Sequence, residues 1–98
     1  MIERLVLLKL KPEHATAAVR ARIAEVTQRL LPTVPGVTGV AVTEAADDAT
    51  AQSWDLCLHV RFAAIEDVAI YLPHPVHRAY VDEHLVPVVA AKSALNFR

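Results

Sequence analysis

The sequence contains little of what marks disulfide-rich, zinc-binding or membrane-spanning proteins. Cys57 is the only cysteine, which excludes an internal disulfide and a cysteine-type zinc site. No apolar run approaches the roughly 20 residues that a bilayer-spanning helix needs. The chain also lacks a basic segment followed by an apolar stretch and a small-residue cleavage site. We therefore expect a cytoplasmic protein with no membrane contact.

The sequence also has no excess of positive or negative charge, and it has few aromatic residues. Ten Lys and Arg face eleven Asp and Glu, and the chain has one Trp, two Tyr and two Phe. The basic residues are scattered, whereas nucleic-acid-binding proteins usually gather them in a patch interleaved with aromatic residues. We therefore exclude a nucleic-acid partner.

What the sequence does have is an abundance of apolar residues. Hydrophobic residues make up 54% of the 98 positions, and the mean hydropathy is +0.32. A chain of this length forms one domain, residues 1–98, whose surface is large relative to its volume. Such a domain cannot hide so much apolar surface alone. We therefore expect a second buried surface, most simply a homodimer interface.

Hydrophobic periodicity predicts the order β-α-β-β-α-β, in which the second crossover is split into two helices. This order is the ferredoxin-like pattern of the α+β class, with a four-stranded antiparallel sheet and helices on one face. A second copy would cover the other face and form a dimeric α+β barrel. The expected strands are 1–10, 37–44, 54–62 and 92–97, the expected helices are 13–31, 64–72 and 75–86, and 45–50 is an expected loop.

The segment Tyr71-Leu72-Pro73-His74-Pro75-Val76-His77 places a phenol and two imidazoles on a turn that two prolines stiffen. Histidine titrates near neutral pH, so His77 is a candidate general base and Tyr71 a candidate donor to a developing oxyanion. The structural alternative is that His77 packs at a helix start and donates to a backbone carbonyl, while Tyr71 is a half-buried core residue. His74 is expected at a helix N-cap and is also a candidate substrate-binding residue.

Several segments together resemble the stress-responsive A/B barrel domain (Dabb) family. The most specific is Y-x-x-H-P-x-H at 71–77. The others are the opening segment Ile2 to Leu10 ending in Leu8-Lys9-Leu10, the turn Val34-Pro35-Gly36-Val37, the strand ending in Phe62, and the closing strand ending in Phe97. One departure is Asn96, where the family often carries an Asp before its terminal aromatic residue.

This resemblance implies a homodimeric α+β barrel, in a family most of whose members have no assigned reaction. Some members are linked with plant stress responses, and at least one plant member is a polyketide cyclase that closes a ring by an aldol-type reaction. The resemblance implies that His77 matches its general base and that Tyr71 matches the residue that orients or polarises the substrate. Arg4 and Leu56 stand where the cyclase has two further pocket histidines, so both become candidate substrate-binding residues.

The remaining polar candidates concern charge and metals. Arg4 lies among apolar neighbours, where a guanidinium usually pairs with a carboxylate or binds an anionic ligand. His74 and His77 have a spacing that a metal site would complete with a third ligand, from Asp82 or His84. We expect neither a metal nor another cofactor.

The sequence leaves three functions open. The first is a homodimer that binds a small carbonyl or polyketide-like ligand in an apolar cavity beneath 71–77, and catalyses a cyclisation or isomerisation with His77 as the base. The second is a non-catalytic stress-response or structural dimer. The third is a haem-degrading monooxygenase of the wider dimeric barrel superfamily, for which only Trp54 and a few histidines could serve the haem.

Overall fold

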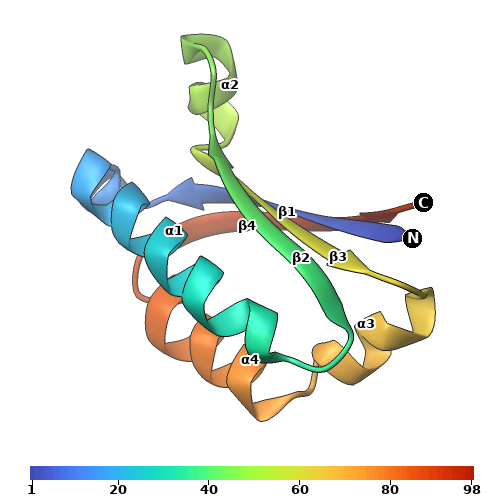
Figure 1. Cartoon of the computed structure of the whole chain (residues 1–98). Helices are drawn as coiled ribbons and strands as arrows, with labels where there is room; N and C mark the ends of the chain where they lie inside the picture. Colours follow the sequence, from blue (N-terminus) through green and yellow to red (C-terminus); the bar gives the residue numbers. More distant parts are fainter.

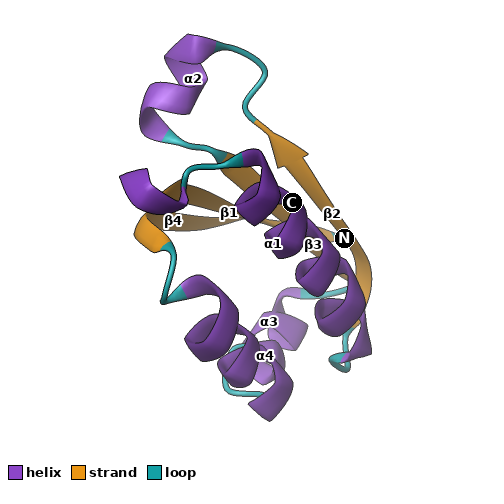
Figure 2. Ribbon diagram, turned by 90° about the vertical axis from the view of Figure 1, so that its left-hand side faces the viewer, coloured by secondary structure: helices purple, strands orange, loops and turns teal.

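The computed structural model describes every residue from 1 to 98. Its centre is a four-stranded sheet in the order β2-β3-β1-β4, in which all neighbouring strands are antiparallel. Helices cover one face of this sheet (Figure 1 and Figure 2). The predicted α+β, ferredoxin-like fold is confirmed. The strands are β1 (Ile2–Leu10), β2 (Val37–Glu44), β3 (Leu56–Phe62) and β4 (Val89–Phe97).

Two helical crossovers, one before β2 and one before β4, pack on the same face of the sheet. The second crossover is split, as predicted, because Pro73 and Pro75 interrupt the chain between two short helices. No helix is both long and apolar enough to cross a membrane. The helices are η1 (Pro12–His14), α1 (Ala17–Leu30), η2 (Leu31–Thr33), α2 (Asp48–Ser53), α3 (Ile65–Tyr71), α4 (Pro75–Tyr80) and η3 (Val81–Leu85), a π-helix that continues α4.

Several element boundaries differ from the prediction. β3 begins at Leu56 rather than at 54, and β4 begins at Val89 rather than at 92. Helix capping explains two further differences. The helix expected from residue 13 begins at Ala17, because the Thr16 hydroxyl accepts a hydrogen bond from the Val19 N–H and starts a new helix. The loop expected over 45–50 contains the start of α2, because the Asp47 carboxylate caps it by accepting from the Thr50 N–H at 2.8 Å. Local capping by single side chains therefore overrode the polar composition of that loop.

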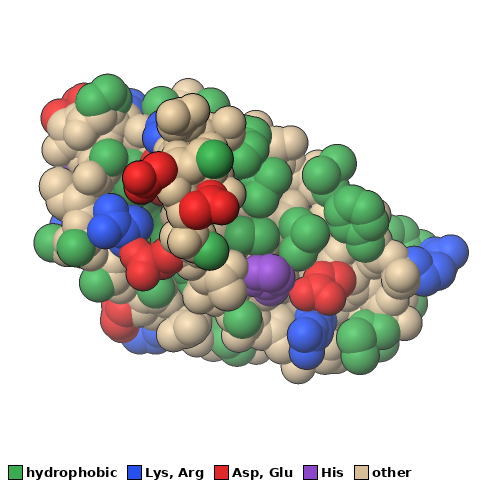
Figure 3. Space-filling model, turned by 90° about the horizontal axis from the view of Figure 1, so that it is seen from above, with side chains coloured by type: hydrophobic (Ala, Val, Ile, Leu, Met, Phe, Trp, Pro, Cys, Tyr) green, Lys and Arg blue, Asp and Glu red, His purple; other side chains and the backbone are tan.

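Alternating side chains give the sheet two unlike faces. On the helix-covered face of β1, Ile2, Val6, Leu8 and Leu10 are buried, and Arg4 is the one charged residue among them. The opposite, open face has no helix over it. Seen from above, hydrophobic side chains are interspersed over this side of the molecule, and histidine is visible between them (Figure 3). The apolar members of the open face include Leu5, Leu7, Leu95 and Phe97, of which Leu95 is 46% and Phe97 53% exposed.

Candidate functional site

A cavity of about 260 Å³ lies between the sheet and the segment that joins α3 to α4. Its walls are mostly apolar. Strand register places Val6 of β1 beside Leu58 of β3 and Ala94 of β4, so these three side chains form one row on the helix-covered face. Arg4 and Lys92 line the cavity on either side of that row. We call this space the His77 cavity, because the His77 ring forms part of its wall.

The turn between α3 and α4 brings Tyr71 and His77 together. The His74 N–H donates to the carbonyl of Tyr71 at 3.1 Å, and His74 Nδ1 accepts from the Val76 N–H, so His74 is the N-cap of α4. One helical turn later the His77 ring lies against the Tyr71 ring, with 4.3 Å between the ring centroids. Phe62 also contacts Tyr71, with 5.1 Å between the ring centroids in an edge-to-face arrangement. The capped turn between α3 and α4 and the contact with Phe62 thus fix both rings at the cavity.

The protonation state of His77 follows from its hydrogen bond. Nδ1 lies 2.8 Å from the carbonyl oxygen of Leu72, which can only accept, so Nδ1 carries the proton of the neutral ring. Nε2 is therefore the nitrogen with a free lone pair. Burial lowers the pKa of His77; the bond to Leu72 works in the opposite direction, and the nearby cations Arg78, Arg4 and Lys92 add to the lowering. The ring is neutral at pH 7 and can accept a proton at Nε2.

The Tyr71 hydroxyl is available to a ligand. The side chain is 2% exposed, yet its hydroxyl makes no hydrogen bond to the protein, while no side-chain oxygen or nitrogen in the structure is fully buried without a partner. The accessible part of this side chain therefore faces the His77 cavity that it lines. Burial raises the pKa of the Tyr71 phenol, so the hydroxyl keeps its proton and can donate it in a hydrogen bond.

Three cationic side chains line the cavity and no carboxylate does. Arg4 Nη1 donates to the side-chain oxygen of Asn96 at 3.0 Å, and neither Arg4 nor Lys92 takes part in an ion pair. Arg78 lies 3.5 Å from the Asp82 carboxylate, on the exposed side of the helix. The sequence allowed two kinds of partner for Arg4, a carboxylate of the protein or an anionic ligand. In the structure no carboxylate pairs with Arg4. The cavity is positively charged around a neutral imidazole.

The structure brings three of the five candidate residues together. Arg4, Tyr71 and His77 line the His77 cavity, whereas His74 is engaged in the cap of α4. Leu56 is 2% exposed and packs beneath α1, and Leu58, two residues further along β3, lines the cavity instead.

Sequence reasoning missed most of the other lining residues, among them Lys92, Leu58, Tyr80 and Arg78. Tyr80 is buried, its hydroxyl lies 2.6 Å from the Thr27 hydroxyl, and burial raises its pKa to about 12. The strand alternation that ends at Phe62 would have indicated Leu58, but Lys92 becomes visible only with the β1–β4 register.

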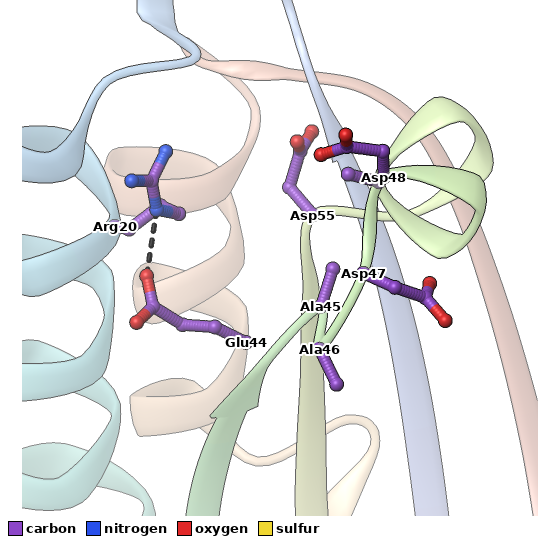
Figure 4. A pocket seen from close by; sticks show the side chains of 8 residues that line it. Arg20, Glu44, Ala45, Ala46, Asp47, Asp48 and Asp55 are labelled. Carbon is purple, nitrogen blue, oxygen red and sulfur yellow. Dashed lines mark hydrogen bonds and ion pairs between the residues drawn. The ribbon is translucent and has the colours of Figure 1, made fainter.

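A second hollow, of about 330 Å³, lies beside α2 and has the opposite charge. We call it the α2 hollow. Arg20 and Glu44 lie on one side of it and are joined by a 2.6 Å ion pair, and the acidic side chains of 47, 48 and 55 lie around the loop and α2 on the other side (Figure 4). Asp55 accepts from the Leu10 N–H at 2.8 Å and Asp47 from the Thr50 N–H. No group of three or more His, Cys, Asp or Glu side chains is placed to hold a metal ion, here or elsewhere.

Comparison with known proteins places this geometry in context. The sequence pattern that defines the Stress responsive A/B Barrel Domain family matches residues 2–97. No curated protein matches the sequence. Among solved structures, a Dabb family protein with a ferredoxin-like fold from Mesorhizobium loti is similar, with a TM-score of 0.83 and 21% identity over 99% of this chain and 94% of that one.

Two further structures extend the comparison. A dimeric protein of unknown function with a ferredoxin-like fold, from Bacteroides fragilis, has a TM-score of 0.79 and 20% identity over 99% of this chain and 94% of that one. A hydroxynitrile lyase from Passiflora edulis has a TM-score of 0.80 and 13% identity over 98% of this chain and 90% of that one. At these identities the similarity establishes the shared fold.

Proposed function

The chain belongs to the stress responsive A/B barrel domain family, and we propose that it binds a small carbonyl compound in the His77 cavity and moves a proton on it. In this proposal Nε2 of His77 removes an acidic proton from carbon next to a carbonyl group. The Tyr71 hydroxyl donates to the enolate oxygen that forms. The carbanion then attacks a second carbonyl within a polyketide-like ligand, which closes a ring, or is reprotonated at another carbon, which isomerises the ligand.

One observation carries this proposal: the 2.8 Å hydrogen bond between His77 Nδ1 and the Leu72 carbonyl. A general base needs a free lone pair and a fixed orientation, and this bond supplies both. The lowered pKa of His77 keeps the ring neutral at pH 7, which is the form that accepts a proton. The lining supports the proposal as well, because most of its residues are hydrophobic and few polar groups compete for a developing charge.

Deuterium exchange tests the catalytic step without knowledge of the natural ligand. We use 3-oxohexanamide, whose protons between two carbonyl groups are acidic, and follow its exchange in D₂O by proton NMR. His77→Gln is expected to reduce the protein-dependent exchange rate by about 10²- to 10⁴-fold, the usual contribution of a positioned base. His84→Gln is the matched control, because His84 lies on η3 and does not line the cavity. Equal rates for the wild type and His77→Gln would refute the proposed base.

We also propose that the protein is a homodimer joined through the open face of the sheet. Leu95 and Phe97 are large apolar side chains left exposed there, and the similar protein from Bacteroides fragilis is described as dimeric. Leu95→Glu is expected to give monomers at micromolar concentration in sedimentation velocity, because it places a charge in an apolar interface. Ile70→Glu, at a comparably exposed residue on α3, is the control. A monomeric wild type would contradict the proposal.

The open face also favours the second candidate, in which dimer formation itself is the function and the histidines are structural. The His77→Gln protein separates the two. Under the catalytic proposal it remains a dimer and loses exchange activity, whereas a purely structural dimer shows no His77-dependent exchange in any variant. The haem hypothesis has no comparable support, because Trp54 is the C-cap residue of α2 and does not line the His77 cavity.

A further inference from the structure

We propose that the ligand of the His77 cavity carries a carboxylate and that Arg4 binds it. This inference narrows the proposed function to one class of ligand and rests on that proposal for the identity of the site. It concerns a residue of this chain, Arg4, whose charge the protein itself leaves without a counterion.

Arg4 carries its charge on an otherwise buried strand face, with no counterion beside it. It is the one charged residue on the helix-covered face of β1, and it is only partly exposed. A guanidinium withdrawn from water usually has a carboxylate beside it, because otherwise its lost hydration is not offset. Here its side-chain partner is the Asn96 amide, at 3.0 Å. Asn96 accepts one hydrogen bond and orients the guanidinium, but it neutralises none of the charge, and the remaining N–H groups stay free to bind a carboxylate.

The surrounding charges act in the same direction. Lys92 reaches the cavity from β4, the strand next to Arg4, and Arg78 reaches it from α4. No acidic side chain lines the cavity. A cavity lined by cationic groups and by no acidic one attracts anions and repels cations.

The size of the cavity limits the ligand further. Its volume of about 260 Å³ lies below the range of roughly 300 to 1,000 Å³ that is typical of sites for drug-sized molecules. A short oxo acid fits these limits, with its carboxylate on Arg4 and its carbonyl-activated carbon beside His77. Arg4 and His77 line the same cavity from opposite layers, the sheet and the helices, so a ligand held by the first is presented to the second.

The test compares two probes that differ in charge and hardly in shape: 3-oxohexanoate and 3-oxohexanamide. Isothermal titration calorimetry at pH 7 is expected to show the wild type binding the acid about tenfold more tightly than the amide, the usual scale of one charge-assisted contact. Asn96→Asp keeps the hydrogen bond to Arg4 but supplies an internal counterion. It is expected to weaken binding of the acid about tenfold and to leave binding of the amide within about twofold.

Two further variants guard the interpretation. Gln52→Glu adds the same charge as Asn96→Asp at an exposed position of α2, far from the α3–α4 turn (Figure 1), and is expected to change neither affinity. Arg4→Gln keeps a hydrogen-bond donor without the charge and is expected to reduce the preference for the acid to what Lys92 and Arg78 contribute. Equal wild-type affinities for the two probes, or an Asn96→Asp protein that binds the acid as tightly as the wild type, would overturn the inference.

The same two probes separate this inference from the proposed function. Exchange of the amide depends on His77 and not on Arg4. If the amide exchanges through His77 but the acid is bound no better, the anion inference fails and the proposed function stands. If the acid is preferred in an Asn96-dependent way while no exchange depends on His77, the inference stands and the proposed chemistry fails. Absence of binding by both probes would overturn the inference.

Discussion

The His77 cavity and the α2 hollow have similar volumes and opposite charge, and they differ most in what their charged groups already do. In the α2 hollow, Asp47 caps a helix, Asp55 binds a backbone N–H and lies 3.5 Å from the Lys9 ammonium, and Glu44 pairs with Arg20. In the His77 cavity, Arg4 and Lys92 have no counterion. The acidic side chains of the α2 hollow other than Asp48 are thus engaged by the scaffold itself. The uncompensated charge of Arg4 and Lys92 instead indicates a place for a ligand.

The largest expected effect comes from two leucines of β3, one in the His77 cavity and one outside it. Leu58 lines the His77 cavity, and Leu56 packs beneath α1 and pairs in register with Glu44 at the edge of the α2 hollow. Each is 2% exposed, so replacement by alanine is expected to lower the free energy of unfolding by about 2–5 kcal/mol. Urea denaturation measures both losses. Only Leu58→Ala is expected to change the affinity for 3-oxohexanamide, and a change with Leu56→Ala would show that the two regions are not separate.

A smaller effect is expected from replacing Asp55. This replacement tests whether the Asp55 carboxylate stabilises the fold or binds a ligand. Its carboxylate accepts from the Leu10 N–H and faces Lys9, and the side chain is 11% exposed. Asp55→Asn is expected to lower the free energy of unfolding by about 1–3 kcal/mol, because it weakens a charge-assisted hydrogen bond to a partly buried N–H. The affinity for both oxo probes should stay at the wild-type value in calorimetry. A loss of affinity without a loss of stability would assign the α2 hollow to ligand binding.

The smallest expected effect is a pH dependence of stability that comes from His77. Its pKa is lowered in the folded protein relative to the model-peptide value of 6.5. Between the lowered value and 6.5 the unfolded chain therefore binds more protons than the folded one, and the stability falls as the pH falls through this window. Urea denaturation at pH 7 and pH 5 should show a smaller decrease for His77→Gln than for the wild type. Identical decreases would show that the burial of the ring has no energetic consequence.

The α2 hollow has its own pH window, which does not overlap with that of His77. The pKa of Asp47 is lowered from 3.8 by its hydrogen bonds to the Thr50 hydroxyl and N–H. A carboxylate with a lowered pKa contributes stability that is present above the unfolded value and lost as the pH falls through the folded value. Its contribution therefore disappears only in the acid range, so a decrease between pH 7 and pH 5 that depends on His77 is not contaminated by Asp47.

The sequence predicted the fold and the central pair of the candidate site because both depend on local patterns. Alternation gave the strand that ends at Phe62, and two prolines around His74 gave the break between α3 and α4. Whether a short polar segment forms a loop or a capped helix was harder to predict. Nothing in the composition of 45–50 revealed that Asp47 would cap a helix rather than lie in a loop.

The rest of the site depends on contacts between residues far apart in the chain. Lys92 reaches the cavity because β4 pairs with β1 in a particular register, and the neutral partner of Arg4 is Asn96, near the other end of the sequence. The choice between Leu56 and Leu58 depends on where the α3–α4 turn crosses the sheet, since both side chains point to the same face. Such placements follow from packing over the whole chain and cannot be obtained from spacing alone.

The acceptor that orients His77 belongs to the main chain, and this has a consequence for how the protein can change over evolutionary time. Every amino acid at position 72 offers the same carbonyl oxygen, so replacing the partly exposed Leu72 side chain leaves the acceptor in place. A mutation at position 72 therefore does not change which nitrogen of the His77 ring carries the proton. Divergent descendants of this chain can therefore alter the cavity wall and change ligands while the proton-accepting nitrogen keeps its direction.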